Sequence, residues 1–212
     1  MTDFPGDRDM SDTAMALPDL THLSVGEPVT SKKGGGIRIC PILLDRKPLK
    51  LVVGTPDKPL RVPFHVQPFN ADDTTTRLNL NLEIIDEQLQ EFWRILDDKV
   101  LSEIETNSDL FRKPLTRDNL ALMFRPTLPP NGKFQPILRV KIEIAEGTRR
   151  VRTWDSNSEL VELPSDWKDL MVAAHVEIKG VWLSSSMLGM SLEATDVMLF
   201  DTNGSAECPF DF

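Results

Sequence analysis

Residues 76–104, "TRLNLNLEIIDEQLQEFWRILDDKVLSEI", contain a change of hydrophobic period that decides the fold. As far as Ile84, apolar and polar residues alternate, which predicts a β-strand with one packed face and one wet face. From Asp86 onward, apolar residues recur every three or four positions. This spacing predicts an amphipathic helix with Asp86 as its N-cap. The helical stripe consists of Leu89, Phe92, Trp93, Leu96, Val100 and Ile104.

The flanking sequence contains more strand patterns than helical ones. Short apolar runs divided by proline or glycine come before it, at "IRICPILL", "LKLVVG" and "LRVPFHV". Further runs follow it, at "PILRVKIEI", "RRVRTW", "LMVAAHVEIKGVWL" and "LGMSLEATDVMLF". One shorter helix is predicted from Thr116 to Phe124, because Pro126 prevents its continuation. We therefore expect an α+β, mainly β domain built on a small curved or closed sheet around one long helix.

Composition divides the chain into three parts. Residues 1–30 are acidic and lack a periodic apolar pattern, so they are predicted to form a disordered arm. Residues 31–200 hold the strand and helix patterns and are predicted to form one domain, entered through the basic stretch "SKKGGG". Residues 201–212 are predicted to form a tail that is acidic and ends on an aromatic residue.

Several classes of function are excluded by what the sequence lacks. No run approaches the roughly 20 apolar residues of a membrane span, and no secretory signal is recognised at residues 1–15. Cys40 and Cys208 are interpreted as free thiols of an intracellular, reducing compartment, either the nucleus or a cytoplasmic viral replication site. The three histidines are isolated, so no metal is expected. With no catalytic or phosphate-loop motif, we expect neither an enzyme nor a cofactor.

The net charge of −9 is unevenly distributed along the chain. Residues 31–61 carry eight bases and two acids, a net charge of +6, and residues 125–152 carry seven bases and two acids, a net charge of +5. The last 20 residues carry five acids and no base. A basic interior between acidic ends is therefore compatible with a nucleic-acid partner despite the negative total.

Strand phases indicate where such a partner would bind. Alternation places Arg150, Arg152 and Trp154 on one face of a strand, and it places Arg139 and Lys141 opposite the apolar side of another. Cations with an aromatic among them suit single-stranded nucleic acid, because they follow the phosphates while rings stack on unpaired bases. The alternative is a solvated cationic sheet face that binds nothing.

The remaining aromatic residues fall into two groups. Trp93 and Trp182 share their phase with apolar neighbours, so both are expected in the core. Phe64, Phe69 and Phe134 lie beside prolines in predicted loops, where each is either a core plug or an exposed stacking platform.

These blocks, in order, resemble the single-stranded DNA-binding proteins of large nucleocytoplasmic DNA viruses and related chains of some protists. The resemblance covers roughly residues 31–200 and rests on "SKKGGG", "PLKLVVGTPDKPLRVPFHV", "LNLNLEI", "FRPTL", "FQPILRVKI", "VEIKGVWL" and "LGMSLEATDVML". It implies an OB-like β-barrel with an inserted helix and non-catalytic binding of single-stranded DNA. The long acidic arm and the absence of tyrosine depart from that pattern. The candidate binding residues are Lys32, Lys33, Arg38, Lys50, Arg61, Phe64, Lys133, Phe134, Arg139, Lys141, Arg150, Arg152 and Trp154.

The tail "SAECPFDF" also resembles the acidic, aromatic-ended tails of bacterial and phage single-strand-binding proteins. That resemblance implies a hook for replication or repair proteins, which would also compete with DNA for the basic groove. Its candidate residues are Glu207, Pro209, Phe210, Asp211 and Phe212. The alternative is an ordinary exposed terminus.

The favoured hypothesis is a single-stranded DNA-binding protein that acts in replication, recombination or repair and that could form a homo-oligomer. A protein of virion or scaffold assembly, whose cationic face meets an acidic protein, is the alternative. Salt-dependent binding to oligo-dT separates the two.

Overall fold

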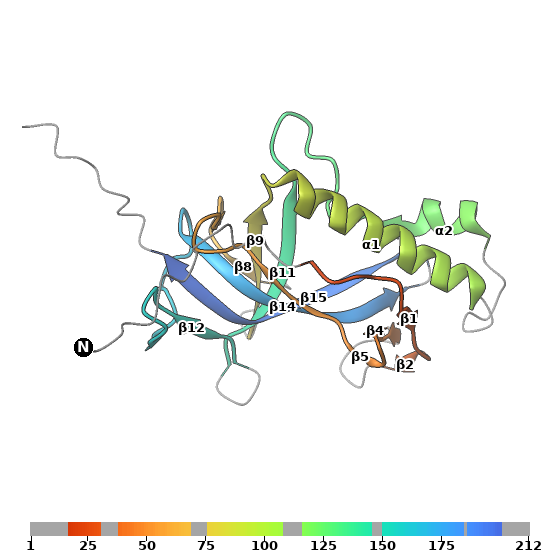
Figure 1. The fold of residues 1–212 in the computed structure, drawn as a ribbon, viewed down its shortest axis with the longest axis horizontal. Coiled ribbons are helices and arrows are strands. Elements are labelled where there is room, and N and C mark those ends of the chain that lie inside the picture. The colour runs from red at the N-terminus through yellow and green to blue at the C-terminus, as the bar shows by residue number, and fades with distance from the viewer. Residues whose placement is uncertain are drawn as a thin grey trace, which may run out of the picture.

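A computed structural model describes residues 17–30, 38–68, 76–107, 116–145, 150–184 and 186–200 (Figure 1). The two longest strands, β14 (Met171–Leu183) and β15 (Leu188–Phe200), form an antiparallel ribbon through the middle of the molecule. Both were expected from their apolar runs. Because the ribbon is long, other strands pair along both of its outer edges.

Strands on either side of the ribbon extend it into a sheet. β14 pairs antiparallel with β3 (Arg38–Cys40), β6 (Lys50–Val53) and β7 (Leu60–Arg61). β15 pairs in parallel with β10 (Phe124–Arg125), β11 (Ile137–Glu143) and β12 (Arg152–Trp154). β11 then pairs antiparallel with β9 (Arg77–Glu83), the alternating strand. The remaining strands are β1 (Leu23–Val25), β2 (Val29–Thr30), β4 (Ile42–Leu44), β5 (Lys47–Pro48), β8 (Gln67–Pro68) and β13 (Leu160–Val161).

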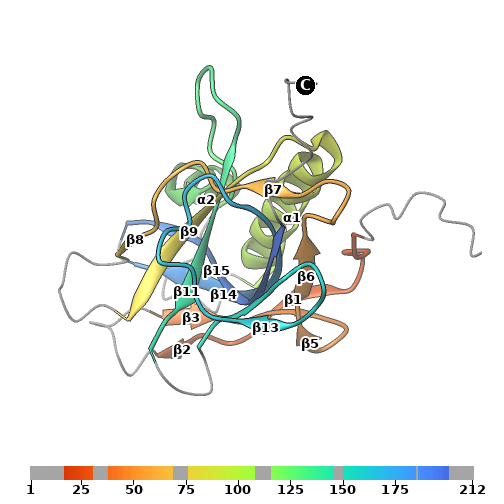
Figure 2. The same cartoon turned by 90° about the vertical axis from the view of Figure 1, so that its left-hand side faces the viewer.

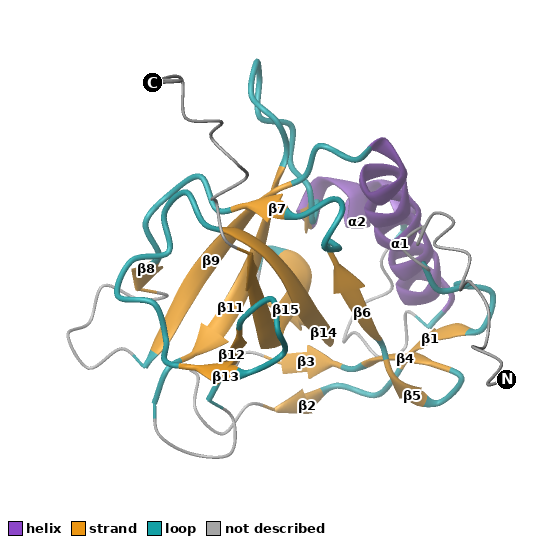
Figure 3. Ribbon diagram, turned by 60° about the vertical axis from the view of Figure 1, so that its left-hand side comes forward, coloured by secondary structure: helices purple, strands orange, loops and turns teal. Residues whose placement is uncertain are grey.

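The sheet is strongly curved (Figures 2 and 3). β7 belongs to the β14 side, yet it also contacts β9 from the other side, so the sheet curls around the core. In the described part of the chain, the hydrogen-bonded path runs from β2 to β8 without closing. The prediction of a mainly β, curved sheet with an inserted helix is confirmed, and in the described residues the sheet is open rather than a closed barrel.

Helix α1 (Glu87–Thr106) lies between β9 and β11 in the sequence and covers the core side of the sheet (Figure 3). The Asp86 side chain accepts hydrogen bonds from the amides of Gln88 and Leu89, as expected of an N-cap. The predicted stripe is buried, and each large apolar side chain contributes about 1.5–3 kcal/mol. The buried residues of α1 are Leu89, Phe92, Trp93, Leu96, Val100 and Ile104, as predicted, together with Leu101.

The second helix, α2 (Arg117–Met123), also forms where it was predicted. Thr116 caps it, and the chain leaves the helix at Phe124, ahead of Pro126. Arg117 forms an ion pair with Asp98, which joins α2 to the exposed side of α1. None of the helices in the described ranges is long and apolar enough to cross a membrane.

One predicted boundary needs correction. The sequence placed residues 1–30 in a disordered arm, but residues 17–30 contain β1 and β2. Leu20, Leu23 and Val25 are buried in the core, so the folded part begins before residue 31. The acidic composition concealed this short apolar contribution. Residues 1–16 and the predicted tail 201–212 lie outside the described residues.

Candidate nucleic-acid interface

The side of the sheet that faces away from α1 and the core is called the outer face here. On β9, Leu80 and Leu82 point into the core, and on β11 Val140 and Ile142 do the same, so the residues between them lie on the other side. The outer face includes Lys50 on β6; Arg77, Asn79, Asn81 and Glu83 on β9; Arg139, Lys141 and Glu143 on β11; Arg152 and Trp154 on β12; His175 and Glu177 on β14; and Ser191, Glu193, Asp196 and Met198 on β15.

Arg152 and Trp154 form an aromatic–cation pair on the outer face. The intervening Thr153 is buried, and the Arg152 guanidinium carbon lies 5.4 Å from the centroid of the Trp154 ring. This separation is within the range of a cation–π contact. The predicted common face of these two residues is therefore confirmed. Arg150, which precedes β12, is half-buried.

A carboxylate on β15 organises this pair. Asp196 accepts a hydrogen bond from the Trp154 Nε1–H at 3.0 Å and forms an ion pair with Arg152 at 2.6 Å. Burial acts to raise the pKa of Asp196. Hydrogen bonds from Trp154 and Thr195, together with the charge of Arg152, outweigh burial, so the pKa is lowered and the carboxylate stays ionised.

Arg139 and Lys141 differ in their surroundings, although both lie on β11. Arg139 is exposed and forms no ion pair with any described residue. Lys141 is half-buried, and its Nζ donates to the Ser191 hydroxyl at 3.2 Å. Burial and the nearby charge of Arg77 lower the pKa of Lys141, while Glu193 acts in the opposite direction. Arg139 is therefore the more available of the two for a phosphate.

Carboxylates accompany several other cations of the outer face. Arg77 pairs with Glu143 at 3.0 Å across β9 and β11. Glu177 on β14 binds both Lys50, at 3.5 Å, and Lys179, at 2.9 Å. The alternation within each strand predicted these basic residues but not their carboxylate partners. The partners come together only through the register between neighbouring strands, which the sequence does not show. An incoming phosphate would have to replace a carboxylate at each pair.

Two loops carry exposed phenylalanines at the end of the sheet where β9 finishes. Phe134 is 78% exposed beside Lys133 in the projecting loop 126–136 (Figure 2). Phe64 is 52% exposed in the loop after β7. Phe64 and Phe134 are therefore exposed, and neither is a core plug. Phe69 lies outside the described residues.

The other candidates are dispersed. Arg61, on β7, forms an ion pair with Asp169 at 2.5 Å, and the hydrogen bond to this carboxylate raises the pKa of Arg61 further. Arg38 is half-buried at the start of β3, opposite Leu183. Lys32 and Lys33 lie outside the described residues, as do Glu207, Pro209, Phe210, Asp211 and Phe212.

The prediction that Trp182 lies in the core is wrong. Trp93 is fully buried as expected, but Trp182 is half-buried and does not belong to the core. The register shift at Ile178/Gly180 adds one residue, Lys179, to β14 and changes which of the side chains beyond it point outward. Gly180 was the available signal, because an isolated glycine within a strand pattern often marks a bulge. Glycine is needed at this position because the backbone φ is +140° and because a Cβ atom would clash with the Cys40 carbonyl.

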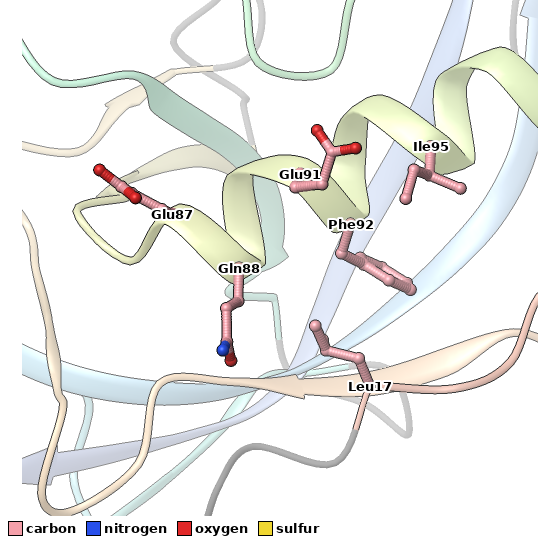
Figure 4. Close-up of a pocket in the computed structure, with 6 residues that line it drawn as sticks. All are labelled: Leu17, Glu87, Gln88, Glu91, Phe92 and Ile95. Atoms are coloured by element: carbon pink, nitrogen blue, oxygen red, sulfur yellow. The ribbon is translucent and has the colours of Figure 1, made fainter.

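An apolar groove of about 390 Å³ lies on α1, outside the outer face (Figure 4). It is lined by Leu17, Glu87, Gln88, Glu91, Phe92 and Ile95. Two glutamates at its rim disfavour a phosphate-bearing ligand, although Arg94 pairs with Glu91. The groove is therefore not part of the candidate interface.

Comparison with protein-family models and with curated protein sequences found no match. Solved structures that resemble the chain include gp2.5, a single-stranded DNA-binding protein encoded by bacteriophage T7. It is 12% identical over 72% of this chain and 87% of that chain, with a TM-score of 0.48. Another is the single-stranded DNA-binding protein from bacteriophage Enc34 in complex with single-stranded DNA. It is 11% identical over 81% of this chain and 94% of that chain, with a TM-score of 0.44.

These likenesses are distant in both sequence and geometry, so the function of the chain has to be inferred from its own residues. Membership of the viral family named from the sequence stays a prediction.

Proposed function

We propose that this chain is a non-catalytic protein that binds single-stranded DNA on its outer face and on the adjoining loop 126–136. The observation that carries the proposal is the placement of accessible rings beside cations. Trp154 lies against Arg152 on β12, and Phe134 follows Lys133 at the surface. Unpaired bases offer flat faces to such rings while the cations meet the phosphates. Replication, recombination and repair are the processes that expose such strands.

The rings favour a single strand over a duplex as the ligand. Duplex readout needs an element that enters a groove, most often a helix presented to the major groove. Here α1 buries its apolar stripe against the sheet, and its exposed residues include more acids than bases, namely Glu87, Glu91, Asp98 and Glu105 against Arg94 and Lys99. A helix with this surface repels phosphates, whereas bases inside a duplex cannot reach the rings.

Ion pairs on the outer face are compatible with binding that is reversible and sensitive to salt. Phosphates would exchange with carboxylates at Arg152 and Lys50, so each such contact yields less than a free cation would. Arg139 and Lys133 need no such exchange, because neither forms an ion pair with a described residue. We therefore expect these two to contribute most to phosphate binding.

Titration with oligo-dT at several salt concentrations tests the proposal. The double variant Lys133→Glu/Arg139→Glu should bind more weakly, and its log–log salt slope should be shallower by about 0.7 for each phosphate that is no longer neutralised. Lys99→Glu on α1 serves as the control, since it reverses an exposed charge away from the outer face. Equal affinities and slopes for wild type and a folded double variant would contradict the proposal. Binding to an acidic protein without oligo-dT binding would instead favour an assembly role.

The tail at residues 201–212 lies outside the described residues, and its part in the proposal is inferred from its composition and from where β15 ends. We propose that its acidic residues compete with DNA for the outer face and that Phe210 and Phe212 contact replication or repair proteins. Support comes from the last described strand. β15 ends at Phe200, only two residues after Met198, which lies opposite Trp154. The tail thus begins beside the Arg152–Trp154 pair.

A further inference from the structure

A second aromatic–cation arrangement occurs at the other end of the β14–β15 ribbon. Trp182 on β14 lies opposite Gly189 on β15, and Gly189 in turn lies opposite Arg125 on β10. Residues directly opposite in neighbouring strands point to the same face, so Trp182 and Arg125 flank Gly189 on one side of the sheet. Ser191 and Glu193 follow Gly189 at alternate positions, so this is the outer face.

The glycine allows the Trp182 ring to lie down on the sheet. A Cβ atom at residue 189 would come within 2.9 Å of the ring, so the indole occupies the space above that backbone. The indole Nε1–H donates to the Met190 carbonyl at 3.2 Å, which satisfies its one polar group and fixes its orientation. A half-buried ring held this way is a pre-formed flat surface.

The cation next to this ring is not matched by a carboxylate. Arg125 is exposed, and its Nε donates to the Met187 sulfur at 3.2 Å, a weak acceptor. It forms no ion pair with any described residue. Lys141 lies close by, with its Nζ on the Ser191 hydroxyl. By contrast, Arg152 beside Trp154 is bound to Asp196.

We propose that Trp182 and Arg125 form a second contact point for single-stranded DNA, in which one base stacks on Trp182 and a neighbouring phosphate meets Arg125. The inference rests on the proposed function and extends it to the other end of the outer face. Gly189 and Met198, the partners of Trp182 and Trp154, are nine residues apart on β15. At about 3.3 Å per residue this is a path of about 30 Å. A strand with the duplex rise of about 3.4 Å needs roughly nine nucleotides to bridge it.

Tryptophan fluorescence tests the contact directly with a 15-nucleotide oligo-dT. Trp93 and Trp167 are buried, so quenching by a stacked base should come from Trp154 and Trp182. In a Trp154→Phe variant, quenching should persist, and it should disappear when Trp182→Phe is added. If the single variant binds the oligonucleotide without any quenching, the inference is wrong while DNA binding stands. If the wild type does not bind, both proposals fail.

Affinity provides an independent measurement. Trp182→Leu should weaken binding by roughly 5- to 150-fold, the range for loss of one stacked base, whereas Trp182→Phe should retain much of the affinity.

Arg125→Gln is an exposed change that should leave folding intact and make the salt slope shallower by about 0.7. Lys99→Gln, which removes one charge on α1, is the matched control. An Arg125→Gln protein with the affinity and slope of this control would overturn the phosphate contact.

Discussion

Asp196 holds the aromatic–cation pair of the proposed interface, Arg152 and Trp154. Its carboxylate binds the Arg152 guanidinium and the Trp154 indole and also accepts a hydrogen bond from the Thr195 hydroxyl. The same contacts have two opposing effects on DNA binding. They fix the geometry of the ring, and they neutralise the cation that a phosphate would approach.

Replacing Asp196 with Asn separates these two effects. The amide oxygen can still accept from Trp154, but the negative charge beside Arg152 is gone. We expect Asp196→Asn to bind oligo-dT more tightly than wild type, with a salt slope steeper by about 0.7 because one more cation is available. Glu91→Gln on α1, which also frees an arginine from an ion pair, should leave DNA affinity unchanged. A salt slope that stays unchanged in a folded Asp196→Asn protein would exclude Arg152 as a phosphate contact, whatever its affinity.

Strand phase alone could predict that Arg152 and Trp154 share a face, because alternation depends only on the local sequence. It could not predict Asp196 as their partner. That contact depends on the parallel register of β12 and β15, which are joined in space but distant in the chain. The sequence therefore showed the cations of the interface and not the carboxylates that neutralise them.

At the scale of elements, α1 and the loop 126–136 are joined by one side chain. Asp97 of α1 accepts hydrogen bonds from the Thr127 amide at 2.8 Å and the Thr127 hydroxyl at 2.6 Å. This fixes the base of the loop that carries Lys133 and Phe134. Burial raises the pKa of Asp97 to about 6, although both hydrogen bonds from Thr127 act to lower it.

The raised pKa predicts a specific dependence of stability on pH. The folded state takes up a proton at Asp97 at a higher pH than the unfolded chain, whose carboxyl has an ordinary pKa of 3.8. The resulting stabilisation is complete below that value and is lost as the pH rises through about 6. Within this window the free energy of unfolding changes by at most about 1.4 kcal/mol per pH unit.

Asp97→Asn should remove this dependence, because the amide does not titrate. Denaturant unfolding of both proteins between pH 4.5 and 7 should show the wild type gaining stability on acidification relative to the variant. Histidine titrations are common to both proteins and cancel in the difference. A constant difference across the range would show that Asp97 has an ordinary pKa in the folded protein.

Long elements with a strict period were the predictable part of the fold. The alternation in β9 and the stripe in α1 each repeat often enough to be recognised, and both formed as expected. Trp182 was not predictable in this way, because the extra residue of β14 between Ile178 and Gly180 breaks the alternation on which the prediction was based. β1 and β2 were missed because each is only two or three residues long.

At the scale of the whole molecule, charge and architecture divide it into two sides. The acidic exposed face of α1 lies on the core side of the curved sheet, and the cations proposed to bind DNA lie on the outer face or on loop 126–136. A net charge of −9 therefore does not oppose DNA binding uniformly. Acidic residues oppose it most where they can approach the outer face. Strand β15 ends at Phe200, two residues after Met198 on that face.

Deletion of residues 205–212 tests whether the tail competes with DNA. The truncated protein should bind oligo-dT more tightly than the full chain at low salt. The difference should shrink as salt is added, because screening weakens the competing carboxylates. The double variant Glu207→Gln/Asp211→Asn should reproduce the effect, while Phe210→Ala/Phe212→Ala should not, since competition depends on charge. Melting temperatures should remain equal among all four proteins. Weaker DNA binding or a lower melting temperature after truncation would show instead that the tail supports the fold or the interface.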